Sequence, residues 1–253
     1  MDSPPAPLMT PRSHVYPIRG SHPTEGAFNQ LWPHCHSVPG AYFWLGTCYT
    51  GGAAFSWLRE QWGRPDPEAD GEAGFEELIR QAAAAPPGSE GFFFLPWLQG
   101  SGTPHPDAAA RGGWLGLTLH HTRAHLIRAV LEGIVFDLRQ ILDCLVELGL
   151  PLTEVRLGEG AARSDLWKQM QAEVLNRSLR LLETRAASPL GAAILAGVAG
   201  GVFPDFASAC ERAVRIEGEL EPDPAVARAY ETAYREFRSF YPTLSPWFHR
   251  RRR

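Results

Sequence analysis

The clearest hydrophobic pattern in the chain is a run of apolar residues at helical spacing near its middle. After Thr122, apolar side chains recur every three or four positions at Leu126, Val130, Ile134, Leu138, Leu142 and Leu145. Threonine is a good N-terminal cap, and Gly149 followed by Pro151 is a common way for a helix to end. The pattern therefore predicts a long helix from Thr122 to Leu148, with an apolar face against a sheet or another helix.

Shorter patterns on both sides of this helix predict further strands and helices. We expect strands at residues 41–48, 91–97, 114–117, 155–157 and 178–182, and helices at residues 53–62, 75–85, 164–175, 190–201, 205–214 and 223–241. The first 40 residues are rich in proline, histidine and serine and show no periodicity, so we expect an extended lead-in with one short strand near residues 34–38. The alternation in the second half favours an α/β domain with helices packed on a mixed sheet.

Composition narrows the class of protein. With 253 residues, 44% of them hydrophobic, the chain can bury one substantial core. A net charge of −4 and a pI near 6.1 argue against a nucleic-acid binder, and we expect the basic tail at residues 249–253 to be a solvated, disordered end. Four separated cysteines without a CxxC pair fit a reducing cytoplasm. Neither a signal peptide nor an apolar run of about 18 residues is recognisable, so we expect no secretion and no membrane span.

One turn could bind a flat ligand or a phosphate. Residues 157–164 (LGEGAARS) stand between a predicted strand and a predicted helix. Small residues there allow a ligand to approach the backbone, and a helix N-terminus offers free N–H groups. The segment does not complete GxGxxG, because Arg163 stands at the last position. A tight turn without a ligand would have the same spacing, and the pattern alone leaves both interpretations open.

The remaining candidate motifs are weaker. His121 and His125 have a metal-ligand spacing, but Thr122 stands where HExxH needs glutamate, so we expect an ordinary helix start and no metal site. The sequence contains neither GxSxG nor GxxxxGK[ST], which removes the commonest hydrolase and P-loop hypotheses. Glu132 and Asp137 are five positions apart and do not share a helix face, so we expect Glu132 to cap or orient a loop inside the fold.

A family resemblance becomes specific at residues 112–132 (GGWLGLTLHHTRAHLIRAVLE). This segment resembles the second signature of the FGGY carbohydrate kinases, and every signature position is filled, by Gly112, Trp114, Gly116, Leu117, His125, Leu126, Ala129, Val130, Leu131 and Glu132. PWLQGSGTPHPD resembles the xylulokinase-type loop, with Ser101-Gly102 in place of the usual Glu-Arg. GEGAARSDLW resembles the adenosine motif, residues 190–193 match the helix after it, and CYTGGAAFSWLR resembles the first strand–helix turn of the C-terminal domain. The likeness covers residues 35–241.

The resemblance implies a ribonuclease-H-like domain of the actin and hexokinase type, which uses Mg-ATP to phosphorylate a hydroxyl of a sugar or polyol. Carried over by position, it places Gly52 and Ser56 near the nucleotide. Gly160, Ala161, Ala162 and Asp165 would line the adenosine pocket. Ala161 stands where the family has a second glycine, so its methyl group would either require unusual backbone dihedrals or take up space that the nucleotide uses.

The resemblance also implies a missing part. Family members are nearly twice this length, and their N-terminal lobe supplies the catalytic aspartate, the first phosphate loop and most sugar contacts. Here Asp2 is the only aspartate before Asp66, so we expect no catalytic residue in this chain. We expect a lead-in at residues 1–33, the kinase C-terminal domain at residues 34–243 and a basic tail at residues 244–253. The chain would be a truncated, cytoplasmic, nucleotide-side lobe that is inactive alone. The alternatives are half of a split kinase, or a non-catalytic remnant that binds a partner or forms a homodimer.

Overall fold

A mixed sheet forms one side of the molecule. The computed structural model describes residues 8–10, 13–19, 31–38, 41–62, 71–150, 152–158, 164–184 and 186–250. The strand order in the sheet is β3-β4-β2-β1-β7-β8-β9. The strands are β1 (Leu8–Thr10), β2 (Ser13–Arg19), β3 (Trp32–Cys35), β4 (Ala41–Gly46), β7 (Val155–Leu157), β8 (Leu179–Leu182) and β9 (Ile216–Leu220). Strand β7 is parallel to β1 and to β8, whereas the other pairs are antiparallel, which confirms the mixed sheet.

The helices lie close to the predicted ranges. They are α1 (Gly51–Trp62), α2 (Gly71–Ala82), α3 (Arg123–Glu147), α4 (Asp165–Leu175), α5 (Ala187–Ala199), α6 (Phe206–Ala213) and α7 (Pro224–Arg250). A 3₁₀ turn, η2 (Ser89–Gly91), precedes a small antiparallel hairpin of β5 (Phe93–Leu95) and β6 (Gly113–Leu115). None of the helices that the structure describes is both long enough and apolar enough to span a bilayer.

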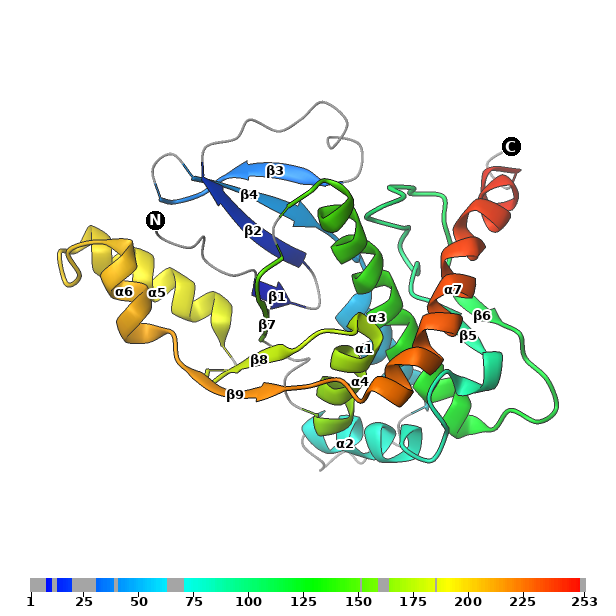
Figure 1. Cartoon of the computed structure of the whole chain (residues 1–253). Helices are drawn as coiled ribbons and strands as arrows, with labels where there is room; N and C mark the ends of the chain where they lie inside the picture. The colour runs from blue at the N-terminus through cyan, green and yellow to red at the C-terminus, as the bar shows by residue number, and fades with distance from the viewer. Residues whose placement is uncertain are drawn as a thin grey trace.

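Helix α3 is the centre of the core. Figure 1 shows it in the middle of the molecule, with the sheet on one side and α7 and the β5–β6 hairpin on the other. It begins after Thr122, whose backbone is extended, and Gly149 follows its end with a φ of 70°, so both predicted boundaries are confirmed. The sequence predicted one apolar face, but side chains all around α3 are buried, because α1, α2, α4, α7 and β5 surround it.

The structure differs from the prediction at three places. Strands β1 and β2 lie within residues 1–33, where we expected only an extended lead-in, and the strand expected near residues 34–38 is β3. Strand β9 was not predicted, because most of its residues are exposed and it has no buried run to reveal it. Helix α7 was predicted to end at residue 241, but it continues to Arg250. It therefore includes residues 244–250 of the tail that we expected at residues 244–253.

Packing explains why α7 continues past its predicted end. Pro242 and Pro246 lie inside the helix, and each removes a backbone hydrogen-bond donor. The last turns nevertheless bury Phe248, which is 3% exposed and packs edge-on against Trp97 at 6.2 Å between ring centroids. Tyr241, one position before the first proline, packs against the same indole at 5.8 Å. Burial of these rings offsets the lost hydrogen bonds. Because the rings pack on Trp97, far away in the sequence, the local sequence alone does not predict that the helix continues.

Candidate nucleotide site

Gly52, the second residue of α1, has free space beside it among the described residues. Thr50, which precedes the helix, is buried, and its hydroxyl donates to the Pro96 carbonyl, so the β5 segment fixes this turn. At Gly52, no heavy atom of the described residues, apart from its neighbours and its own helix, lies within 4 Å of the position that a Cβ would take. Ser56 follows one turn later on the same side of the helix and is half-buried. The first N–H groups of a helix have no partner inside it, so the free space at Gly52 makes this turn a candidate ligand site.

The N-terminus of α4 is the second part of the site. The Ser164 hydroxyl accepts a hydrogen bond from the Trp167 N–H at 3.3 Å and caps the helix. Asp165 is the first helical residue, and its side chain is 97% exposed although it pairs with Lys168 at 2.7 Å. An acid here interacts favourably with the helix dipole. The predicted contact residues Gly160, Ala161 and Ala162 lie outside the described residues, so their part in the site stays a prediction.

The structure brings these two helices together. The Phe55 ring on α1 packs against the Trp167 indole on α4, with ring centroids 5.6 Å apart. The indole N–H of Trp167 is buried and has no hydrogen-bond partner among the described residues, which is uncommon for a buried donor. Gly158 directly follows β7, and an added Cβ there would lie 3.4 Å from the Cβ of Ala187 at the start of α5. The helices that carry Gly52, Ser56 and Asp165 therefore meet near their N-terminal ends.

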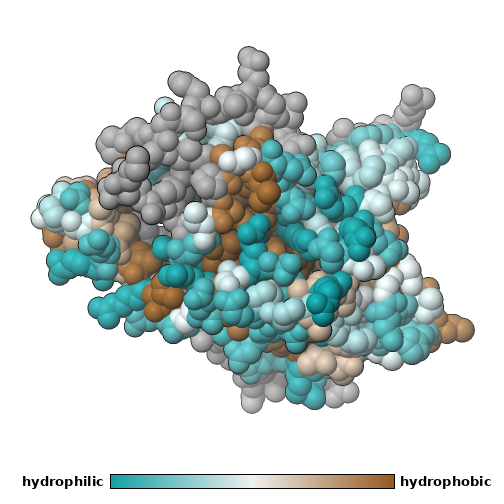
Figure 2. Space-filling view, in the orientation of Figure 1, coloured by the Kyte–Doolittle hydropathy of each residue, from teal (hydrophilic) through white to brown (hydrophobic). Residues whose placement is uncertain are grey.

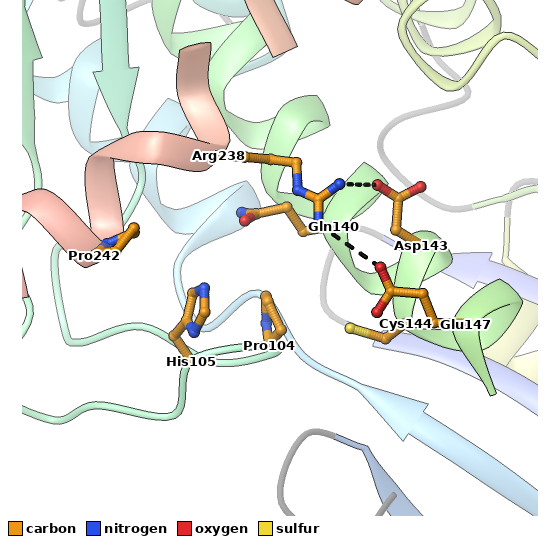
Figure 3. A pocket seen from close by; sticks show the side chains of 8 residues that line it. All are labelled: Pro104, His105, Gln140, Asp143, Cys144, Glu147, Arg238 and Pro242. Atoms are coloured by element: carbon orange, nitrogen blue, oxygen red, sulfur yellow. Dashed lines mark ion pairs between the residues drawn. The ribbon is translucent and has the colours of Figure 1, made fainter. Parts of the chain in front are cut away.

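A separate pocket of about 270 Å³ lies between α3, α7 and the loop at Pro104. Figure 3 shows Arg238 of α7 pointing toward two acids of α3, and its guanidinium is 3.7 Å from Asp143 and 3.7 Å from Glu147. Burial, and then the positive charge of Arg238, lower the pKa of His105. None of the three described nucleotide candidates lines this pocket. The sequence analysis missed it, because α3 and α7 are far apart in the chain and only the tertiary fold brings them together.

Two acids of α3 have structural partners, as the sequence analysis expected for Glu132. The Glu132 carboxylate accepts hydrogen bonds from the Gly88 N–H at 2.8 Å and the Ser89 hydroxyl at 2.7 Å, and it therefore orients the turn at η2. Asp137 accepts from the Trp97 indole at 3.1 Å, and burial raises its pKa to about 6. The two carboxylates thus bind different parts of the core and do not form an acid pair.

The fold defines the class of protein, a domain with the ribonuclease-H-like fold of the actin and hexokinase type that sugar kinases share. The crystal structure of xylulose kinase from Rhodospirillum rubrum superposes with a TM-score of 0.78 at 32% identity, over 96% of this chain and 48% of that one. Residues 19–200 match the C-terminal domain of the FGGY family of carbohydrate kinases, and the chain belongs to this family.

Two relatives show which enzymes the chain resembles. A xylulose kinase of Staphylococcus epidermidis is 31% identical over 206 residues, which are 81% of this chain and 40% of the relative. A glycerol kinase of Gloeobacter violaceus is 37% identical over 194 residues, which are 76% of this chain and 36% of the relative. The chain thus matches less than half of the length of these relatives, 40% of the first and 36% of the second.

Proposed function

We propose that this chain is the nucleotide-side lobe of a carbohydrate kinase, which transfers the γ-phosphoryl group of Mg-ATP to a hydroxyl of a sugar or polyol. The observation that carries the proposal is the open N-terminus of α1 at Gly52, packed through Phe55 against the helix that begins with Asp165. Two relatives with known acceptors, xylulose kinase and glycerol kinase, support a polyhydroxylated acceptor.

The described residues fit a nucleotide in charge and in shape. The N-terminal ends of α1 and α4 carry partial positive charge and unpaired N–H groups, which suit phosphates and ribose hydroxyls. Gly52 lets a ligand approach the backbone, Ser56 offers a hydroxyl on the same face, and Asp165 offers an exposed carboxylate. In this proposal Gly160, Ala161 and Ala162 line the adenosine. Magnesium would come with the phosphates, which supply much of its coordination in kinases.

In this proposal the general base belongs to another lobe. Phosphoryl transfer to a hydroxyl needs a carboxylate within hydrogen-bond reach of that hydroxyl. Glu132 and Asp137 are each 1% exposed and already accept hydrogen bonds from the core, so neither can reach a substrate. We therefore propose that the base lies in a lobe equivalent to the unmatched half of the relatives, and that this chain alone does not phosphorylate a sugar.

Mg-ATP binding to Gly52→Val tests the nucleotide site. We expect calorimetry of the unaltered chain to show saturable binding. Gly52→Val should weaken that binding at least about tenfold, because the branched side chain fills the space in front of α1 while no described neighbour obstructs it. Thermal unfolding should be unchanged for the same reason. Gly191→Val is the matched control, since Gly191 also lies in a helix with free space around it.

Two results would contradict this prediction. One is the absence of heat at millimolar Mg-ATP with the unaltered chain. The other is equal affinity in Gly52→Val and Gly191→Val. Ala161→Leu in the same titration extends the test to the predicted adenosine turn, where a larger side chain should also weaken binding.

Adding a separate N-terminal lobe tests whether this chain needs a second lobe to transfer phosphate. We expect no transfer of phosphate to xylulose or glycerol by this chain alone. ADP release should appear when a separately produced N-terminal lobe of a xylulose kinase is added, and it should disappear with Gly52→Val. A mixture that stays inactive with every ketose and polyol would contradict the split-kinase hypothesis.

The same mixture also tests the alternative that this chain is a non-catalytic binding or dimerisation module. The exposed apolar side chains of Leu195 on α5 (44% exposed) and Val202 just beyond it (71% exposed) favour an association surface. An inactive mixture together with a stable dimer in sedimentation would support this second function.

A further inference from the structure

Three potential metal ligands meet at the start of α3. The Glu90 Oε2 atom lies 2.6 Å from His120 Nε2 and 3.1 Å from His125 Nε2, and all three ligand atoms lie within 4.8 Å of one another. Ligands at about 2.0–2.2 Å around a tetrahedral zinc ion are about 3.3 Å apart. We propose that Glu90, His120 and His125 bind one divalent transition-metal ion of the zinc type, at a site separate from the nucleotide site.

The ligand types select this class of ion. Imidazole nitrogen suits zinc, nickel, cobalt and copper, whereas magnesium and calcium prefer ligand sets made of oxygen. Two imidazoles and one carboxylate form a known three-ligand set for zinc, which leaves a fourth position for water or another ligand. Magnesium brought by ATP is therefore not the ion expected here.

The site is assembled from three segments of the chain, each held by its own contacts. Glu90 stands in the η2 turn with a φ of 54°, which residues other than glycine rarely adopt, and the adjacent Ser89 hydroxyl is bonded to buried Glu132. The His120 N–H donates to the Thr118 hydroxyl at 3.3 Å. His125 lies in the first turn of α3, the helix that is buried in the centre of the core. The turn at Glu90 therefore has an unusual backbone that the fold maintains, and that backbone directs a carboxylate toward two imidazoles.

The inner histidine has a partner that can orient it toward a metal. His125 Nδ1 lies 2.9 Å from the Thr122 hydroxyl and 3.2 Å from the Thr122 N–H. An ion on Nε2 requires the ring proton on Nδ1, and that proton can be donated to the Thr122 hydroxyl. Such an outer hydrogen bond is typical of histidines that bind metals. Binding would thus select one tautomer of His125, and the Thr122 N–H would give up its contact with the ring.

Charge and exposure agree with an open site. The Glu90 carboxylate supplies an oxygen ligand beside the two imidazoles, and its side chain is 43% exposed. The His125 side chain is 9% exposed, whereas His120 is 71% exposed, so the cluster is buried at one end and open at the other. In Figure 1 the loop between β6 and α3 projects from the edge of the molecule, and Figure 2 shows apolar surface at the same edge. Leu117 and Leu119, which belong to this loop, are exposed. The fourth position of the ion would therefore face solvent.

Titration of the metal-free chain with zinc chloride, without nucleotide, tests the site. We expect one ion per chain with micromolar or tighter affinity, and a cobalt substitute should give the visible absorption of a four- or five-coordinate ion. His120→Gln and Glu90→Gln should each weaken zinc binding at least about tenfold, since each removes one of three ligands. His249→Gln is the control, because this half-exposed imidazole pairs with Asp107 away from the cluster.

Thermal unfolding and zinc affinity distinguish a metal site from its absence. A rise in the unfolding temperature with zinc, present in the unaltered chain and in His249→Gln but lost in His120→Gln, supports the site. No binding at millimolar zinc, or equal affinity in His120→Gln and the unaltered chain, would overturn it. Both ligand variants change exposed side chains, so circular dichroism should show unaltered folds. Because the titration contains no nucleotide, its result is independent of the proposed kinase function.

Discussion

Glu132→Ala should destabilise the protein by about 3–5 kcal/mol, the cost of leaving one member of a buried ion pair without its partner. Glu132 is 1% exposed and Arg128 is 4% exposed, and the Arg128 Nε lies 2.7 Å from the Glu132 carboxylate. Burial lowers the pKa of Arg128, but the charges and hydrogen bonds of Glu132 and Tyr230 together outweigh burial and leave that pKa above its ordinary value. Without Glu132, the guanidinium stays charged and buried.

The other partners of Arg128 cannot replace the carboxylate. The guanidinium also donates to the Ala85 carbonyl at 2.9 Å and to the Tyr230 hydroxyl at 2.8 Å, but both acceptors are neutral. The Tyr230 hydroxyl in turn donates to Glu132 at 2.8 Å, so one deletion removes the acceptor of three side chains at once, those of Arg128, Tyr230 and Ser89. The network joins α3, α7 and the segment after α2, which explains why its loss should be felt across the whole domain.

Chemical denaturation of Glu132→Ala and of two control variants measures the loss in the free energy of unfolding. Tyr230→Phe keeps the ion pair and loses one hydroxyl, so it should cost only about 0.5–1.5 kcal/mol. Glu77→Ala breaks an exposed pair with Arg80, which water and salt screen, so it should cost far less stability than Glu132→Ala. If Glu132→Ala were no more destabilising than Glu77→Ala, the buried network would not carry the stability assigned to it. Glu132→Gln keeps the side-chain shape and serves if the alanine variant does not fold.

The same residue links stability to the proposed metal site. Glu132 holds Gly88 and Ser89, and the next residue along the turn is the proposed ligand Glu90. Glu132 would not touch the ion, yet Glu132→Gln should weaken zinc binding by loosening the turn. It therefore acts as a positioning residue, and its effect should appear in the affinity for zinc even where the domain remains folded.

The sequence predicts the central helix and the role of Glu132 because local signals agree there. The cap position at Thr122, the apolar spacing and the glycine after the helix all indicate the same boundaries. Only the partner of the cap was unexpected, since the Thr122 N–H bonds to His125 Nδ1, where glutamate or glutamine is more usual. The nucleotide residues, in contrast, were identified only through family resemblance, because small residues in a turn do not identify a ligand.

What the sequence could not predict depends on contacts between distant segments. His121 and His125 have the spacing of a ligand pair, but His121 stacks on Phe92 at 4.9 Å and is not among the three clustered ligands. Its neighbour His120 joins the cluster, because the loop before α3 points that side chain toward Glu90, 30 residues earlier in the chain. Strand β9 is similar, since its pairing with β8 and not its own composition makes it a strand.

Gly133→Ala should be destabilising, although alanine favours a helix more than glycine does. The gain in helix propensity is about 1 kcal/mol. Against it, a Cβ on Gly133 would lie 2.1 Å from the Phe94 carbonyl oxygen and 3.0 Å from the carbon of that carbonyl. The obstructing atoms belong to the backbone of buried β5, so a side-chain rotation cannot relieve the clash. Overpacking of this kind costs about 1–3 kcal/mol or more, and a contact this short belongs at the upper end. We therefore expect a net loss of about 2 kcal/mol, measured by urea unfolding.

Gly191→Ala separates the two effects, because it makes the same chemical change without the clash. Gly191 lies inside α5, and no described atom outside its own helix comes within 4 Å of the added Cβ. Only helix propensity acts there, so the substitution should stabilise the domain by about 0.5–1 kcal/mol. Opposite signs at the two glycines would show that the approach of α3 to β5 requires glycine at position 133. A stabilising Gly133→Ala would mean instead that α3 can move away from β5 at little cost, and that the central helix is not fixed as closely as its burial implies.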